Sequence, residues 1–357
     1  MQMVLHDYFE ALEGGGRLSS ILARDLDCAI GYGFAKPEHP FLSELQQQYN
    51  LQAYSNIPLW RQFQLARAFT HKTAFLHNYQ QVIYSGFYTP LAIAHHQRGQ
   101  NILYCHTPPR FVYDQKAFYL QQVSAPLRPL LSLFIQYLQP RYEHAVQQMD
   151  VIIANSKNIQ QRIKHYLNQE SVVVHPPCEV QHYRWQSQGD YYLSTARLDP
   201  LKRVDKIVQA FKLLPHKKLI VASGGSELQK LKKLAQDAPN IQFTGWLSDS
   251  QLQDLIANAI ATIYLPHNED FGMSPVESMA AGKPVIGVAE GGLLETIIPQ
   301  QTGLLLTPDF SIDELVQAVQ QLDQSTALAM RQTCEHTAQQ FSTSRFIQQM
   351  RAILDSL

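Results

Sequence analysis

The stretch ATIYLPHNEDFGMSPVESMAAGKPVIGVAEGGLLE, residues 261–295, is the clearest indication of the fold class. An apolar strand-like run, ATIYLP, leads through an irregular loop to a helix-like segment and then to a second apolar run, PVIGVA. This order is typical of a parallel α/β unit. We interpret Ser274, Pro275 and Glu277 as the N-cap, N1 and N3 residues of a capping box. A helix that starts at the carboxyl edge of a parallel sheet presents backbone N–H groups, so the stretch predicts a phosphate site.

The same alternation extends over most of the chain. Strand-like runs occur in VLHDYF near the N-terminus and at residues 102–106, 151–156, 172–177, 191–197, 218–224 and 241–245. Helix-like stretches, with apolar residues three or four apart, occupy residues 158–167, 204–214 and 249–260. A proline pair and a polar run at 176–190 separate two sets of these units, and we place an interdomain linker there. The sequence therefore predicts an α/β protein of two domains.

Composition excludes several classes of protein. The chain has 357 residues, of which 45% are hydrophobic and 17% are charged, as in a globular protein. A net charge of −1 argues against nucleic acid as a partner. No stretch approaches the ~20 apolar residues that span a bilayer, and the N-terminus lacks a basic-then-apolar signal, so we expect a cytoplasmic protein. The four cysteines are widely spaced without a CxxC pair, which favours neither a disulfide framework nor a zinc ribbon.

Residues 117–146 depart from the pattern because they are unusually apolar and are interrupted by Pro126, Pro129 and Pro140. The interpretation that we favour is a set of helices, broken at the prolines and buried beside a cleft. The alternative is a lipid-facing surface, through which the N-terminal domain would make a peripheral contact with the inner face of the membrane.

Two carboxylates and two cations near the expected sheet edge could carry chemistry. Glu269 and Glu277 stand before and within the predicted helix, with seven residues between them. On spacing alone, Glu277 would only cap the helix, and Glu269 would be a solvated loop acid. Arg197 and Lys202 lie in ARLDPLKRVD and, taken alone, would be surface cations.

Two features of the N-terminal half also point to a ligand. Three glycines at 14–16 follow the first strand, and the backbone N–H groups of Gly15 and Gly16 could approach a phosphate or a sugar. The alternative is an ordinary flexible turn. His106 ends a strand just before the pair Pro108 and Pro109, where α/β folds expose side chains to a cleft. A core histidine is the competing interpretation.

Together these motifs resemble a known family, the retaining glycosyltransferases of family 4 with the GT-B fold. The E-x7-E pattern from Glu269 to Glu277 is followed by SMAAGKPVI, by the glycine pair at 291–292, by Glu295 and by TGLLL at 302–306, which resembles the family's donor-site region. ARLDPLKRVD, IIANSKNIQQRI and VVVHPPCE extend the resemblance over most of residues 95–350. HTPPR at 106–110 is similar to bacterial mannosyltransferases that build surface polysaccharides.

The resemblance implies two Rossmann-like domains that face each other across a cleft. Residues 1–178 would form the acceptor-binding domain, residues 179–340 the nucleotide-sugar-binding domain, and residues 341–357 a helix that crosses back to the first. The implied reaction is transfer of a hexosyl group to a hydroxyl of a glycan or lipid-linked glycan, with retention of configuration. GDP-mannose is the first donor expected, with UDP-sugars close behind, and neither a metal nor another cofactor is expected. An epimerase of the same fold and a non-catalytic nucleotide-sugar-binding protein are the alternatives.

The resemblance also implies a role for each site residue. Arg197 and Lys202 would contact the donor diphosphate, Glu277 the ribose and Glu269 the hydroxyls of the transferred sugar, while His106 would lie near the reacting sugar. Glu269 is not expected to be a nucleophile, because the family implies same-face attack assisted by the leaving phosphate. Further contacts to sugar and phosphate would come from the backbone N–H groups of Phe271, Gly272, Met273 and Ser274.

Overall fold

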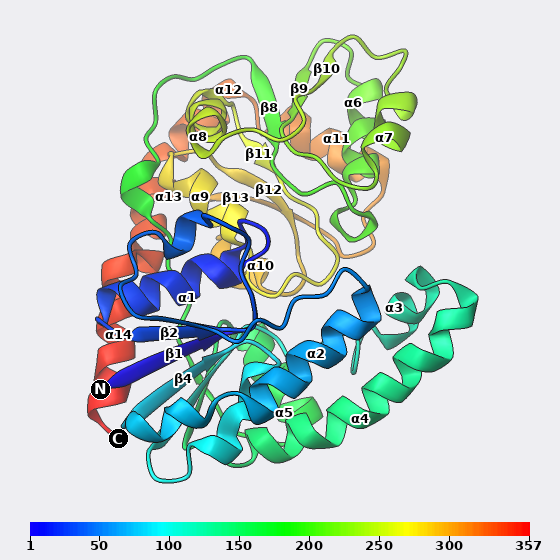
Figure 1. The fold of residues 1–357 in the computed structure, drawn as a ribbon. Coiled ribbons are helices and arrows are strands. Elements are labelled where there is room, and N and C mark those ends of the chain that lie inside the picture. Colours follow the sequence, from blue (N-terminus) through cyan, green and yellow to red (C-terminus); the bar gives the residue numbers. More distant parts are fainter. The chain divides into compact units, whose positions relative to one another are not determined.

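The computed structural model describes residues 1–357 and shows an α/β protein with two separate parallel sheets (Figure 1). The chain divides into two compact units. Unit 1 comprises Met1–His175 and Ile347–Leu357, and unit 2 comprises Pro176–Phe346. The linker predicted at 176–190 begins at this division. None of the helices combines the length and the apolar character that crossing a bilayer would require.

The sheet of unit 1 has seven parallel strands in the order β3-β2-β1-β4-β5-β6-β7. The strands are β1 (Gln2–His6), β2 (Ala29–Tyr32), β3 (Gln48–Asn50), β4 (Gln81–Ser85), β5 (Gln100–Cys105), β6 (Val151–Ala154) and β7 (Val172–Val173). The chain builds outward from β1 to β3, and then from β4 to β7 in the opposite direction. The strand order therefore reverses between β1 and β4, where open α/β sheets bind ligands.

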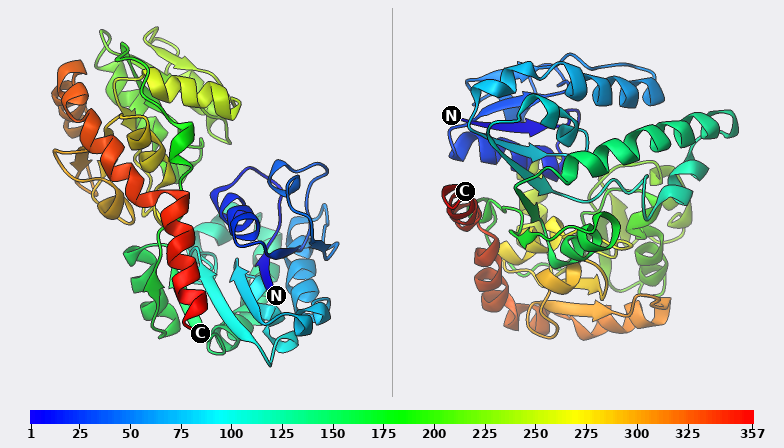
Figure 2. Two further views of the ribbon diagram at one scale, coloured as in Figure 1. Left: turned by 90° about the vertical axis from the view of Figure 1, so that its left-hand side faces the viewer. Right: turned by 90° about the horizontal axis from the view of Figure 1, so that it is seen from below.

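Helices cover this sheet, and its inner strands β1, β2, β4, β5 and β6 are almost wholly buried. The helices are α1 (Gly14–Asp25), α2 (Pro58–His71), α3 (Lys116–Gln122), α4 (Arg128–Val146) and α5 (Lys157–Leu167). The last helix, α14 (Thr343–Asp355), ends in unit 1 and is the red helix that leads to the C-terminus in Figure 2. There Arg351 donates to the carbonyl oxygen of Asp25 over 2.9 Å, and Gln81 donates to that of Leu354 over 2.9 Å.

The sheet of unit 2 has six parallel strands in the order β10-β9-β8-β11-β12-β13. They are β8 (Tyr191–Ser194), β9 (Lys218–Val221), β10 (Ile241–Phe243), β11 (Thr262–Ile263), β12 (Val285–Val288) and β13 (Gly303–Leu306). Its helices are α6 (Val204–Lys212), α7 (Leu228–Leu234), α8 (Asp249–Asn258), α9 (Met273–Ala280), α10 (Leu293–Thr296), α11 (Ile312–Gln321), α12 (Gln324–Ala329) and α13 (Arg331–Ala338). Here the order reverses between β8 and β11.

Residues 117–146 lie mainly in α3 and α4, and one expectation about them is wrong. Pro140 does not break the segment, because α4 continues through it to Val146. The expected burial of these helices holds only in part. Leu131 and Leu138 of α4 lie in the core, but Leu130 and Leu133 are exposed and α3 buries no residue. The surplus of apolar residues in this segment therefore supplies an exposed face as well as a buried one.

Candidate functional site

Most of the predicted site residues of unit 2 lie at the carboxyl edge of its sheet, around the point where the strand order reverses. Arg197 follows β8, whereas Glu269 follows β11 and leads into α9. A parallel sheet gathers the loops after neighbouring strands at one edge, so residues far apart in sequence converge there. Arg197 has a side chain that is 56% exposed, with its Nε 3.8 Å from a carboxylate oxygen of Asp199.

Lys202 and Glu269 form an ion pair at this edge. The Lys202 Nζ lies 2.7 Å from Oε2 of Glu269 and 3.1 Å from the hydroxyl of Tyr264, and both charged side chains are about one-fifth exposed. Burial alone would lower the pKa of Lys202, but Tyr264 and Glu269 raise it above its usual value. Lys202 is therefore a fixed positive charge at neutral pH. The sequence predicted separate roles for Lys202 and Glu269, and the structure couples them.

Arg203 anchors the loop that carries Glu269. Its guanidinium donates over 2.7 Å to each of two backbone carbonyls of that loop, those of Leu265 and Pro266, and pairs with the carboxylate of Glu290. The backbone of Arg203 is left-handed, with φ of +51°. Arg203 was not among the predicted site residues, and its position beside Lys202 was the only signal available for it.

The start of α9 differs from the predicted capping box. The helix begins at Met273, and Gly272 is its N-cap with φ of +100° and no side-chain cap. Glycine tolerates this left-handed conformation, so the chain turns into the helix two residues earlier than Ser274 would allow as a cap. Ser274 is thus the second helical residue, and Glu277 is the fifth. The interpretation of Glu277 as a capping side chain is wrong, and its contact with a ribose stays a prediction.

A glycine pair supports the loop before α9. The N–H of Gly292 donates to the carbonyl oxygen of Glu269 over 2.8 Å. A Cβ atom on Gly292 would lie 2.3 Å from the Cα of Phe271, and one on Gly291 would lie 2.3 Å from the carbonyl oxygen of Glu269. The glycines in the EGGLLE motif are therefore required by close backbone packing against the site loop.

We expect Gly292→Ala to destabilise unit 2 by about 1–3 kcal/mol, because the methyl group meets backbone that cannot rotate away. Urea unfolding measures the change. Gly14→Ala is the control, since nothing lies within 4 Å of a Cβ atom there. It should be neutral or stabilising, because glycine inside a helix is unfavourable. Equal stability of the two variants would contradict the packing argument.

The predicted residues of unit 1 converge in a pocket of about 200 Å³ at the carboxyl edge of its own sheet. The loops after β1, β4 and β5 and the start of α1 enclose it. Its lining includes His6, Asp7, Glu13, Gly15, Gly16, Gly86, Phe87, His106 and Thr107.

The three predicted glycines form the first turn of α1 rather than a flexible turn. A Cβ atom on Gly15 would lie 3.7 Å from the imidazole rings of both His6 and His106, so this helix start lies against both histidines.

A chain of hydrogen bonds runs beneath this pocket. The Ser85 hydroxyl lies 2.8 Å from Nε2 of His106 and 2.8 Å from the hydroxyl of Ser19, which lies 2.9 Å from Nδ1 of His6. Burial lowers the pKa of His106 to about 3, with a further contribution from His6, and it lowers the pKa of His6 to about 4. Both rings are therefore neutral at physiological pH. His106 can serve a ligand as a hydrogen-bonding group but not as a cation.

Asp7 fixes the loop on the far side of the pocket. Its buried carboxylate accepts hydrogen bonds from the backbone N–H groups of Phe87, Tyr88 and Thr89, over 2.9, 2.9 and 3.2 Å. Burial raises the pKa of Asp7 to about 6, although these three bonds lower it. The sequence analysis missed Asp7, His6 and Ser85. The available signal was the pair His6 and Asp7 at the end of the first predicted strand.

One family model matches part of the C-terminal half of the chain. Residues 179–341 match the model described as glycosyl transferases group 1. An alpha-1,3/1,6-mannosyltransferase of Dictyostelium discoideum is 42% identical over 84 residues, which are 23% of this chain and 20% of the relative. A human GDP-Man:Man(3)GlcNAc(2)-PP-Dol alpha-1,2-mannosyltransferase is 24% identical over 231 residues, 55% of this chain and 46% of the relative. The chain thus spans less than half the length of these relatives.

Solved structures match over the whole chain. The crystal structure of Anabaena HepE with UDP-glucose superposes with a TM-score of 0.79 at 17% identity, covering 100% of both chains. A sucrose-phosphate synthase from Thermosynechococcus elongatus has a TM-score of 0.79 at 19% identity, covering 100% of this chain and 98% of that one. At these identities the likeness shows the fold alone. The predicted α/β fold with two Rossmann-like halves, as in GT-B glycosyltransferases, is confirmed.

Proposed function

We propose that this chain is a retaining glycosyltransferase of family 4, of the type that builds surface polysaccharides. It moves a hexosyl group from a nucleotide diphosphate sugar to a hydroxyl of a glycan or lipid-linked glycan. The observation that carries the proposal is the Lys202–Glu269 ion pair at the sheet edge of unit 2. This pair keeps Lys202 positively charged near the start of α9, where a phosphate would bind. Mannosyltransferases among the similar proteins support GDP-mannose as the first donor to test, with UDP-sugars next.

In this proposal, unit 2 binds the donor. Lys202 and Arg197 stabilise the negative charge that grows on the leaving diphosphate, so no metal is needed and activity should survive EDTA. Glu269 accepts hydrogen bonds from the transferred sugar and Glu277 from the ribose, and the backbone N–H groups at Phe271, Gly272, Met273 and Ser274 complete the site. The leaving phosphate assists attack on the same face of the sugar, which retains the configuration.

The pocket of unit 1 serves the sugar and the acceptor. His106 stays neutral and hydrogen-bonded to Ser85, so it contributes a directed hydrogen bond to the reacting sugar rather than a charge. Gly15 and Gly16 offer backbone N–H groups at the start of α1.

A panel of nucleotide sugars tests the proposal. We expect the true donor, at 100 times its Kd, to stabilise the protein by about 2.7 kcal/mol in a thermal-shift measurement. The panel contains GDP-mannose, UDP-glucose, UDP-galactose and UDP-GlcNAc with the free nucleotides, and no shift with any of them would overturn the proposal. With acceptor present, release of nucleotide diphosphate distinguishes transfer from epimerisation and from mere binding, and NMR of the product shows whether its anomeric configuration is retained.

Glu277→Gln is expected to weaken binding of the donor and of the free nucleotide about tenfold while leaving stability unchanged, because a charged acceptor for two hydroxyls is lost. Stability should hold, since glutamine keeps the size and the hydrogen-bonding capacity of the side chain at this fifth helical position. Titration calorimetry with the nucleotide measures the change. Glu170→Gln, at a carboxylate that is 86% exposed in unit 1, is the matched control. Unchanged affinity in Glu277→Gln would remove Glu277 from the ribose.

A further inference from the structure

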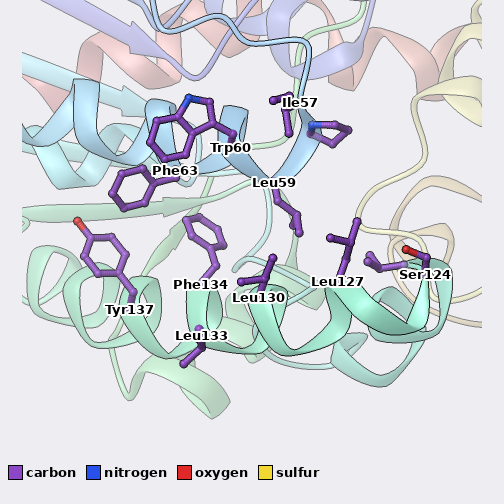
Figure 3. A pocket seen from close by; sticks show the side chains of 12 residues that line it. Ile57, Leu59, Trp60, Phe63, Ser124, Leu127, Leu130, Leu133, Phe134 and Tyr137 are labelled. Atoms are coloured by element: carbon purple, nitrogen blue, oxygen red, sulfur yellow. The ribbon is translucent and has the colours of Figure 1, made fainter.

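An apolar groove lies between α2 and α4, entirely within unit 1. Its volume is about 670 Å³, within the range of about 300–1,000 Å³ that is usual for ligand sites. In Figure 3, Trp60 and Phe63 of α2 face Phe134 and Leu130 of α4. The lining residues are Ile57, Pro58, Leu59, Trp60, Phe63, Val123, Ser124, Leu127, Leu130, Leu133, Phe134 and Tyr137. Only Trp60, Ser124 and Tyr137 carry polar side-chain atoms, one each, so the groove suits hydrocarbon.

The rim of the groove is apolar and exposed. Ile57 is 65% exposed, Trp60 48% and Leu130 53%. Single apolar residues on a surface need no explanation, but a contiguous apolar patch in a globular unit marks an interaction site. We call this feature the α2–α4 groove.

Two cations contact residues that line the groove. Arg128 donates to the carbonyl oxygen of Val123 over 3.2 Å, and the guanidinium of Arg141 lies 3.9 Å from the ring centroid of Tyr137. A ligand in this groove that carries an anionic head would therefore be attracted, and a cationic one repelled.

Aromatic side chains connect the groove to the pocket of His106. Phe87 lines that pocket and contacts Phe111, with ring centroids 5.6 Å apart. Phe111 stacks on Phe134 at 6.3 Å, and Phe134 lines the groove. One row of contacting aromatic rings therefore runs from the pocket to the groove.

We propose that the α2–α4 groove binds the hydrocarbon chain of a phosphate-bearing lipid, whose head presents the acceptor hydroxyl at the pocket of His106. The inference rests on the proposed function for the role of this lipid as acceptor. The binding of the chain itself depends only on the groove, so it can be tested without turnover.

Titration of the full chain with monomeric dodecyl phosphate tests the groove directly. We expect one molecule to bind, and butyl phosphate to bind at least about 100-fold more weakly, because each buried CH₂ group contributes roughly threefold to fourfold in affinity. Dodecyltrimethylammonium, with the same chain and the opposite charge, should also bind at least about tenfold more weakly. Calorimetry below the micelle concentration gives the affinities.

The double variant Leu127→Gln and Leu130→Gln should weaken dodecyl phosphate at least about tenfold. Both side chains are exposed, so the melting temperature should stay the same. Leu213→Gln, at a leucine of unit 2 that is 60% exposed, is the control and should change nothing. Equal binding of butyl phosphate, or full affinity in the double variant, would overturn the inference.

Binding to lipid vesicles distinguishes a groove that holds one hydrocarbon chain from a face that binds the membrane surface. Binding to phosphatidylglycerol vesicles without any binding of monomeric dodecyl phosphate would overturn the groove and identify this face as a lipid-surface contact. Nucleotide-sugar binding on the same preparation reports on the proposed function independently. A preparation that binds donor but no alkyl phosphate contradicts the groove alone, and one that binds alkyl phosphate but no donor contradicts the proposed function alone.

Discussion

Lys202→Ala is expected to lower kcat about 10²–10³-fold, which corresponds to about 2.7–4 kcal/mol in the barrier. The Lys202 ammonium lies 2.7 Å from Glu269 and is held as a cation by that carboxylate and by the hydroxyl of Tyr264. Because the negative charge on the leaving diphosphate increases toward the transition state, the loss should be larger in kcat than in donor affinity. Steady-state rates and nucleotide titrations on one preparation give both quantities.

The ion pair complicates this variant, because alanine leaves the partly buried carboxylate of Glu269 without its lysine. An unpaired charge of this kind is destabilising in itself. The double variant Lys202→Ala and Glu269→Gln removes that charge and should recover stability. Because Glu269 contacts the sugar in the proposal, the single variant Glu269→Gln is the reference. If Lys202 acts on the diphosphate, turnover in the double variant stays well below that of Glu269→Gln, whereas equal turnover in the two would show that the lysine serves only its partner.

Much of the fold could be predicted from the sequence because its strands are short, apolar and separated by amphipathic stretches. The predicted runs at 151–156, 191–197, 218–224 and 241–245 all contain strands, and the three predicted helices are present within two residues. Two central strands were missed. β2 contains Gly31, which weakens a strand pattern, and β4 was not recognised among polar neighbours. Both are fixed by pairing with β1 on either side, which is a tertiary effect.

Parts of the candidate site depend on geometry that a linear pattern does not contain. The prediction of a capping box was wrong although Ser274 and Glu277 have the required spacing. The helix begins earlier because Gly272 adopts the left-handed N-cap conformation without steric strain. The pairing of Lys202 with Glu269 joins residues 67 apart, which the adjacency of β8 and β11 brings together. Asp7 was missed because its importance lies in three backbone groups contributed by another loop.

Asp7→Ala is expected to destabilise unit 1 by about 3–9 kcal/mol. The carboxylate accepts three backbone N–H groups, of Phe87, Tyr88 and Thr89, and each buried donor left without a partner costs about 1–3 kcal/mol. This is a large fraction of the about 5–15 kcal/mol that stabilises an ordinary domain. Urea unfolding measures the loss, and hydrogen exchange at the three amides shows whether it begins in this loop. Unchanged protection of these amides would contradict the assignment.

The pH dependence of stability isolates the carboxylate of Asp7 from its neighbours. Its pKa is about 6 in the folded chain and 3.8 ordinarily, so the folded state binds more protons than the unfolded state between these values. The stabilising contribution of this group is therefore fully present below pH 3.8 and is lost as the pH rises through 6, a change of about 3 kcal/mol. Asp7→Asn keeps one acceptor oxygen but cannot titrate. The stability of the natural protein relative to Asp7→Asn should thus increase as the pH falls from 7 to 4.

The two pocket histidines, His6 and His106, change the pH dependence of stability in the direction opposite to that of Asp7. The pKa of His6 is lowered to about 4 and that of His106 to about 3, so both cost stability as the pH falls through 6.5, where the unfolded chain takes up their protons. They are present in both proteins, and their contribution cancels when the stabilities of the natural protein and Asp7→Asn are subtracted at each pH. Urea unfolding at pH 4, 5, 6 and 7 gives this difference. A difference that stays flat over the series would show that folding leaves the pKa of Asp7 unchanged. A natural protein that loses stability relative to Asp7→Asn toward pH 4 would show that the folded state lowers this pKa.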